Sequence, residues 1–393
     1  MRTRSPRVVA VAAPVIVVLL LAGCSSQDAV TGPARVSTAD APIAVKAGDT
    51  TCDVATTSLA AGRHTFDVTN TAALVTEVYV YAAGDRIVGE VENVGPATIR
   101  SLIVDLPAGE YQVACKPGMV GNGIRTAVIV TGGTAPTLTR DQNLKAAVDS
   151  YRSYVESETQ ALVDTTSAFG AAISSGNLDA AKQAYPTARI HYERIEPIAE
   201  SFGELDPLID MRIDDATEGT PFVGFHAIEQ LLFEKKTITG AQALATNLTA
   251  NVGKLAALIK TVDFTPLMMG NGAKSLLDEV AKSKVTGEEE RYSRIDLVDF
   301  AGNVDGAKHV YTALRPTIQA KDPQLVTTLE QRFSALVDLL GTHAAKPGAA
   351  GLIPGSPFVS YDALTPDDVK ALAVEVDAIS EPLGRISSVV TGG

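Results

Sequence analysis

The hydrophobic pattern of this chain changes once, close to residue 133, and each half has its own period. Before this point, short runs of β-branched and aromatic residues alternate with turn-forming Ala-Gly and Gly-Asn pairs, a pattern typical of strands. After it, apolar residues recur every three or four positions, which is typical of helices. A Gly-Gly-Thr-Ala-Pro segment at 132–136 separates the halves. The sequence therefore predicts a multidomain protein, β first and then all-α.

The first half, residues 43–132, is expected to form a small β-sandwich. In the segment Glu77–Tyr81 two valines alternate with charged and aromatic residues, so the valines face one side of a strand. The runs expected to form strands are 63–69, 75–81, 99–106, 110–115 and 125–130.

The second half, residues 141–393, is expected to be an all-α bundle that follows a linker at 133–140. Pro186 and Pro197 are expected to kink or split the second helix. Thr220–Pro221 is expected to start the third, because threonine caps a helix and proline fits its first turn. The helices expected are 141–174, 177–202, 221–236, 241–262, 273–283, 295–319, 322–344 and 366–388.

An N-terminal leader precedes both halves. Three arginines are followed by an apolar run at 8–21, shorter than the roughly 20 residues that a membrane-spanning helix needs. The run ends in Leu-Ala-Gly-Cys, which resembles the lipobox of bacterial lipoproteins. We expect residues 1–23 to be a signal peptide, Cys24 to carry lipid and 24–42 to be a flexible tether. The protein is then exported and lipid-anchored to the outer face of the cytoplasmic membrane; a plain signal peptide is the alternative.

The chain is acidic, with 46 Asp and Glu residues against 33 Lys and Arg residues and a formal charge of −13. An acidic surface repels phosphate groups, which argues against a nucleic acid as partner. It attracts cations.

Two carboxylates fall on apolar helix faces. On a helical wheel Glu158 lies about 20° from Tyr151, inside the apolar stripe of its helix. Glu229 lies inside the stripe of the third helix, with His226 three residues before it. An ionised carboxylate facing a core is costly unless a charge or a metal compensates it. The pattern favours a shared cation, with pairing to a buried arginine such as Arg189 or Arg212 as the alternative.

More acids lie between these two helices in the sequence. Glu193, Glu196 and Glu200 form a row on one helix face, with Glu196 nearest the apolar stripe, and Asp206 and Asp210 follow at i, i+4 spacing. The row is also compatible with a solvated helix face. Helix bundles build metal sites from inward carboxylates and an i, i+3 Glu/His pair, here in reverse order. Oxygen donors with one imidazole favour hard cations, Fe(III) foremost, with Mn or Ca as alternatives and Zn not ruled out.

Cys52 and Cys115 remain once Cys24 carries lipid. In an exported protein an even pair of cysteines predicts a disulfide, and two metal ligands are the alternative. Their spacing does not separate the two.

Several segments resemble the EfeO iron-uptake lipoproteins, and the resemblance covers nearly the whole chain after the leader. This family joins an N-terminal cupredoxin-like domain to a C-terminal imelysin-like helical domain with an HxxE motif. The segments that carry the resemblance are 192–203, 205–207 with Asp210, 224–229 and 299–307.

The resemblance implies an extracytoplasmic iron-binding component of an EfeUOB-type system, and not an enzyme. Its partners would be the EfeU membrane permease and the EfeB haem peroxidase, and its ion Fe(III) or Fe(II). His226 and Glu229 correspond to the HxxE pair. The acids expected to complete the metal site are Glu158, Glu196 and Asp206, with Glu193 and Asp210 as further candidates.

The β domain departs from ordinary cupredoxins. A blue-copper site needs two histidines, a cysteine and usually a methionine, whereas the segment 115–119 has no histidine and His64 is the only one in the domain. This argues against type-one electron transfer. The EfeO pattern points instead to Cys52, Glu77 and Cys115 as a copper or iron site, beside the disulfide alternative.

A metallopeptidase is the competing function, because imelysin-like domains have been classed with peptidases. A familiar zinc protease needs HExxH, with two histidines four residues apart and a glutamate base between them. This chain has only the His226–Glu229 pair. A structural lipoprotein with a paired polar core is the third alternative.

Overall fold

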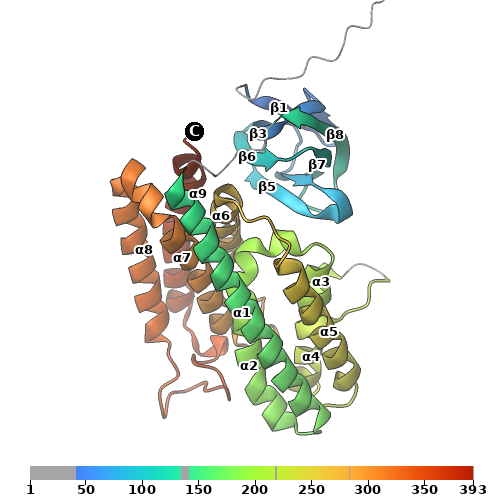
Figure 1. The fold of residues 1–393 in the computed structure, drawn as a ribbon. Helices are drawn as coiled ribbons and strands as arrows, with labels where there is room; N and C mark the ends of the chain where they lie inside the picture. The colour runs from blue at the N-terminus through green and yellow to red at the C-terminus, as the bar shows by residue number, and fades with distance from the viewer. Residues whose placement is uncertain (1–40, 134–140, 217–218, 283, 393) are drawn as a thin grey trace, which may run out of the picture. The chain divides into compact units, whose positions relative to one another are not determined.

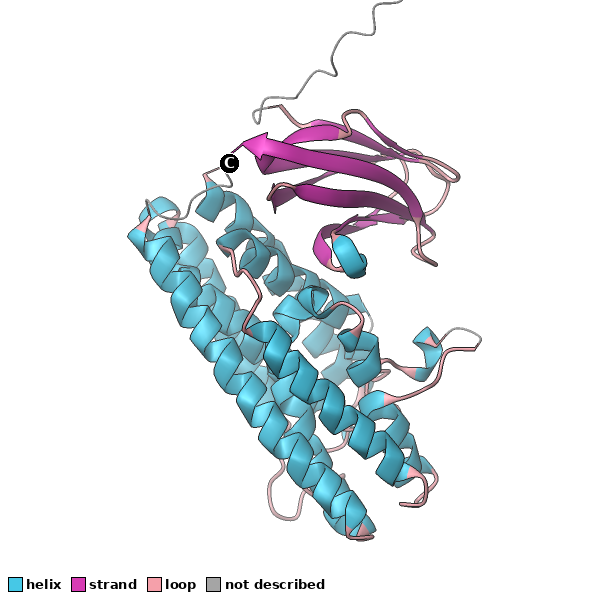
Figure 2. Cartoon of the chain, turned by 45° about the vertical axis from the view of Figure 1, so that its right-hand side comes forward, coloured by secondary structure: helices cyan, strands magenta, loops and turns pink. Residues whose placement is uncertain are grey.

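The computed structural model of the protein has a β part followed by a helical part, which confirms the predicted class (Figure 1). Strands and helices are segregated along the chain, apart from one short 3-10 turn at Ala83–Asp85 (Figure 2). The predicted signal peptide, the lipidated Cys24 and most of the tether and linker lie outside the described residues. Among those described, no helix combines the length and the apolar character that crossing a membrane requires. The structure describes residues 41–133, 141–216, 219–282 and 284–392.

The β part is a sandwich of two sheets that share the long strand β3 (Ser58–Asn70). The first residues of β3 pair with β8, and the rest pair with β1 and β6, so the strand passes from one sheet to the other at an irregularity after Ala60. The other strands are β1 (Ile43–Ala47), β2 (Cys52–Val54), β4 (Thr76–Tyr81), β5 (Ile87–Val94), β6 (Ile99–Leu106), β7 (Gly109–Pro117) and β8 (Ile124–Gly133).

Alternation explains the sandwich core. Buried and less buried residues alternate along β3 and β1, and the buried set from both sheets forms one apolar cluster. The five expected strands correspond to β3, β4, β6, β7 and β8, and only the run 75–81 extends beyond its strand, by one residue. The sequence analysis did not single out β1, β2 and β5.

The helical part is built on long helices, of which α1 and α2 run antiparallel (Figure 1). On α1 the buried residues recur at helical spacing, and they belong to one large apolar core with residues of the other long helices. The helices are α1 (Gln142–Ser174), α2 (Leu178–Ile195), α3 (Leu205–Asp210), α4 (Gly224–Glu229), α5 (Ala241–Ile259), α6 (Pro266–Lys282), α7 (Asp296–Lys321), α8 (Pro323–Thr342) and α9 (Pro366–Thr391).

The second helix is split at Pro197, as predicted: α2 ends at Ile195, and a 3-10 segment, Glu196–Phe202, follows with Pro197 in its first turn, whereas Pro186 stays inside α2. Other helix predictions need correction. The third helix begins at Gly224 rather than at Thr220–Pro221, and a π-helical turn follows it at Gln230–Glu234. The sequence analysis also missed α3 and the first seven residues of α6.

Candidate metal centre

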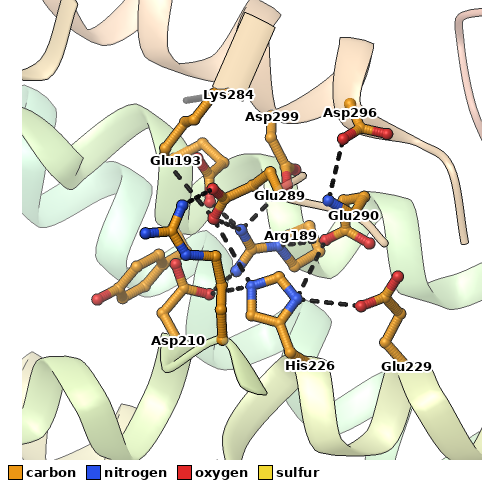
Figure 3. A network of polar contacts seen from close by, with 12 residues as sticks. Arg189, Glu193, Asp210, His226, Glu229, Lys284, Glu289, Glu290, Asp296 and Asp299 are labelled. Atoms are coloured by element: carbon orange, nitrogen blue, oxygen red, sulfur yellow. Dashed lines mark hydrogen bonds and ion pairs between the residues drawn. The ribbon is translucent and has the colours of Figure 1, made fainter. Parts of the chain in front are cut away.

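A buried arginine lies at the centre of a polar cluster inside the helical part (Figure 3). Arg189 of α2 is fully buried and forms ion pairs with Glu193 and Asp210. Its guanidinium also lies 3.0 Å from Glu290 and 3.1 Å from Asp299. One buried cation therefore faces at least four carboxylates, and the acids need further cations or protons for balance.

Gly302 of α7 lets α7 and α2 approach each other closely. A Cβ on Gly302 would lie 2.5 Å from the Cβ of Glu193 and 3.2 Å from the carbonyl oxygen of Ile190. Only a glycine leaves that space free, so α7 packs directly on α2. This contact brings Asp299, one turn before Gly302, beside Arg189.

A second glycine places the HxxE helix. Gly224 has a φ of +80°, and a Cβ there would lie 2.3 Å from the carbonyl oxygen of Ile209. Because glycine fits both requirements, α4 starts directly against the end of α3. His226 of α4 therefore lies next to Asp210, the last residue of α3, with 3.5 Å between Nε2 and Oδ1.

The imidazole of His226 has carboxylates on both sides. Nδ1 lies 3.1 Å from Glu229 Oε2, whereas Nε2 lies 3.5 Å from Asp210 Oδ1 and 3.6 Å from Glu289 Oε1. Among the described residues, His226 belongs to two groups of potential metal ligands, and within each group the ligand atoms lie within 4.8 Å of one another. One joins Asp210, His226 and Glu289, and the other joins His226, Glu229 and Glu290.

The carboxylates on the Nδ1 side are already hydrogen-bonded. Glu229 Oε1 accepts the backbone N–H groups of Tyr292 and Ser293 at 2.8 and 2.6 Å. Glu290 accepts hydrogen bonds from the Tyr185 hydroxyl, at 3.0 Å, and from the Ser293 hydroxyl. On this side Glu229 holds the orientation of the imidazole, as carboxylates behind metal-binding histidines do.

The Nε2 side is different. Nε2 is buried and has no hydrogen-bond partner among the described residues. The two oxygens of Glu289 have different neighbours: Oε2 is 3.1 Å from Arg212 Nη1, and Oε1 is 3.6 Å from His226 Nε2. A cavity of about 80 Å³ adjoins His226, and its lining includes Glu229 as well as Glu289. The arrangement offers one nitrogen and two carboxylate oxygens to a cation.

The charges around His226 keep a proton there in the absence of another cation. Burial alone would lower the pKa of His226, but the neighbouring carboxylates of Glu229 and Glu289 and the charge of Asp210 raise it to about 10. Burial raises the pKa of Asp210 to about 6, against the opposing effect of Arg189. A metal ion that binds Nε2 must therefore replace a proton.

Glu158, a predicted ligand, lies elsewhere in the bundle. Its carboxylate is 2.7 Å from Nδ1 of His191 and 3.4 Å from Nη1 of Arg194. Neither group of potential ligand atoms around His226 includes it. Pairing with an arginine was the alternative for this residue, and the partner is Arg194.

The other predicted acids lie in three places. Asp210 faces His226 directly. Glu193 and Glu196 both bind the ammonium of Lys284, and Asp206 accepts a hydrogen bond from the Tyr192 hydroxyl. These three are not among the ligand atoms grouped around His226.

The sequence patterns do not single out Glu289, Glu290 or Lys284 as site residues. The two glutamates belong to the run Glu288–Glu290 in a segment without helical periodicity, so no apolar stripe marked them as buried. Lys284 lies in a 3-10 turn, Lys284–Thr286. The run of three glutamates itself was the one available signal.

In the β part, Cys52 and Cys115 form a disulfide, one of the two alternatives for this pair. Val78 of β4 lies opposite Cys115 of β7, so these two side chains share the core face. Glu77, the preceding residue, faces the other side of the strand, where it lies 3.5 Å from the Lys116 ammonium. The structure therefore does not bring Cys52, Glu77 and Cys115 together.

Comparisons with known proteins agree with this architecture. The sequence model of the imelysin family, peptidase M75, matches residues 147–386. Proteins named iron uptake system component EfeO, from Escherichia coli K12, Shigella flexneri and Shigella sonnei, are each 35% identical over 358 residues. The match covers 90% of this chain and 92% of each relative. This chain therefore belongs to the imelysin family, within the EfeO group of iron uptake system components.

Proposed function

We propose that this protein captures iron outside the cytoplasm and that the ion binds His226 Nε2, Asp210 and Glu289. The observation that carries the proposal is the buried Nε2 atom, which has two carboxylates within 3.6 Å and no hydrogen-bond partner among the described residues. The relatives' printed name, a component of an iron uptake system, supports iron as the cargo.

The ligand chemistry supports this cargo. One imidazole and two carboxylates form a hard, oxygen-rich set that suits Fe(III) and also accepts Fe(II), whereas a thiolate-free set gives no preference to copper(I) or zinc. Glu229 is hydrogen-bonded to Nδ1 of His226 and so fixes Nε2 as the nitrogen that faces the ion. The site has a single histidine, and no proteolytic step is part of the proposal.

Delivery is the second part of the proposal. The iron passes to an EfeU-type permease, with an EfeB-type haem peroxidase as further partner, and lipid on Cys24 keeps the protein at the outer face of the membrane. The β part is the cupredoxin-like domain of the group. We assign no ion to it while its two cysteines are joined in a disulfide.

Calorimetric titration with Fe(III)-citrate tests the binding site. His226→Ala and Asp210→Asn are expected to weaken iron binding at least 100-fold, because each removes an atom bonded to the ion. Glu158→Gln and His309→Ala are matched controls outside the cluster, and they are expected to bind iron like the wild type. Iron binding that survives His226→Ala would remove the site from consideration.

A further inference from the structure

We propose that Lys284 is a built-in cation that lowers the affinity of the site for iron and so permits its release. The proposal rests on the proposed function and adds a residue that sets the strength of binding. Lys284 is 3% exposed and lies in the short turn between α6 and α7.

The ammonium of Lys284 is bound as a metal ion would be. Its Nζ lies 2.6 and 2.8 Å from the two oxygens of Glu196 and 3.2 Å from Glu193 Oε2. Both acids are largely buried, and Asn303 Nδ2 donates to each of them. The chain thus fills this half of the acid cluster with its own charge.

One carboxylate oxygen joins the two halves. Glu289 Oε1 lies 3.6 Å from His226 Nε2 and 3.9 Å from Lys284 Nζ. An iron ion bound to this oxygen therefore lies close to a fixed positive charge in a buried setting, where charges interact far more strongly than in water. Repulsion between the two cations weakens iron binding without removing any ligand.

Lys284 suits this role better than the neighbouring arginine. Arg189 contacts acids from several helices and holds them together, so its loss would disrupt the bundle. The close partners of Lys284 are Glu193 and Glu196, which do not face His226. The contact of Lys284 with the ligand Glu289 is longer, at 3.9 Å, and Arg212 holds that carboxylate at 3.1 Å. A neutral side chain at 284 therefore changes the charge near the ion and leaves the ligands in place. A protein that must pass on its cargo gains from such a limit on affinity, because a higher affinity usually comes from a lower dissociation rate.

The test is a titration of Fe(III)-citrate into the purified protein and into its Lys284→Gln, Lys284→Met and Lys284→Arg variants. Both neutral variants are expected to bind iron at least tenfold more tightly, a change of about 1.4 kcal/mol, and to release it more slowly. Lys284→Arg keeps the charge and is expected to keep the wild-type affinity. Lys308→Gln, an exposed lysine on α7, is the control for the loss of one charge.

Two results separate this proposal from the one on which it rests. If the wild type binds iron and both neutral variants bind it no more tightly, Lys284 does not set the affinity, and the iron site stands. If the wild type binds no iron, the proposed function fails first. Should the neutral variants not fold, Lys284→Gln/Glu196→Gln removes one charge of each sign. It must bind iron more tightly than Glu196→Gln alone, and equal affinities would overturn the proposal.

Discussion

At the residue scale, the site depends on which nitrogen of His226 carries a proton. Glu229 Oε2 lies 3.1 Å from Nδ1, and Glu229 Oε1 is held by two backbone N–H groups. A carboxylate in this position accepts the Nδ1 proton and leaves Nε2 for the ion. The proposed site thus makes Glu229, expected from the sequence to be a ligand, a positioning residue instead.

Glu229→Gln tests this role. The amide oxygen is expected to stay under the N–H groups of Tyr292 and Ser293, so the amide NH₂ faces His226 Nδ1 and donates to it. The imidazole then carries its proton on Nε2 and loses the ion, with iron affinity reduced about 10- to 100-fold or more. The measurements are iron titration and ¹⁵N NMR of labelled histidine. Glu234→Gln, an exposed acid in the same segment, is the control. Weak binding with Nδ1 still protonated would contradict the argument.

Asp296 gives a pH dependence that does not involve the iron ligands. Burial raises its pKa from 3.8 to about 6, against Arg294 and the backbone N–H of Glu290. The folded protein therefore holds the proton more tightly than the unfolded chain does. This stabilisation is complete below pH 3.8 and is lost as the pH rises to about 6.

Asp296→Asn is expected to remove this loss. Relative to the wild type, the variant should gain about 2–3 kcal/mol of unfolding free energy between pH 3.5 and pH 7.5. Urea unfolding at both pH values measures the gain, and Asp338→Asn, exposed on α8, is the control. An equal effect of Asp296→Asn at both pH values would show that the pKa of Asp296 is the same in the folded and in the unfolded protein.

At the element scale, the approach of α4 to α3 decides whether the ligands meet. Gly224→Ala is expected to lower the unfolding free energy by about 2–4 kcal/mol, because it adds a backbone clash to an unfavourable positive φ. It should also weaken iron binding, since His226 moves away from Asp210. Gly176→Ala has a similar φ of +75° and no atom within 4 Å of the added Cβ. This control is expected to cost about 1–2 kcal/mol and to leave iron binding unchanged. Equal effects of the two substitutions on iron binding would contradict the close-approach argument.

The elements that the sequence predicted well are those in which the apolar pattern is sustained over many residues. Helix α1 spans nearly the expected residues, because a sustained apolar stripe and the Asp141 cap define it. The short elements around the site, α3 and the π turn at Gln230–Glu234, carry no period of their own and are held by tertiary contacts. For the same reason, helical periodicity points to His226 and Glu229, which lie on a helix, and gives no signal for Glu289, which lies in an irregular segment. Glu158 lies inside the apolar stripe on the helical wheel, yet its carboxylate meets His191 and Arg194, so its position on the wheel does not distinguish a metal ligand from a paired acid.

At the scale of the whole molecule, the proposed iron site belongs to the helical part and the disulfide to the β part. Cys52 and Cys115 are 63 residues apart, so their bond restricts a long loop in the unfolded chain. Reduction is expected to cost the β part about 2–5 kcal/mol. Hydrogen exchange should rise in peptides from β2 and β7 and stay constant in α1 and α7.

Iron affinity at the helical site is expected to survive this reduction. The Cys52→Ala/Cys115→Ala double variant is the matched comparison, because it removes the bond without a reductant that also acts on iron. Loss of iron binding in that variant would return the ion to Cys52, Glu77 and Cys115.

Anomalous diffraction at the iron absorption edge, from crystals of the iron-loaded protein, locates the ion directly. We expect one strong peak inside the helical part, from an ion bonded to His226 Nε2 and to oxygens of Asp210 and Glu289, with Glu229 hydrogen-bonded to Nδ1. A peak on the Nδ1 side, between Glu229 and Glu290, or a peak in the β part alone, would contradict it.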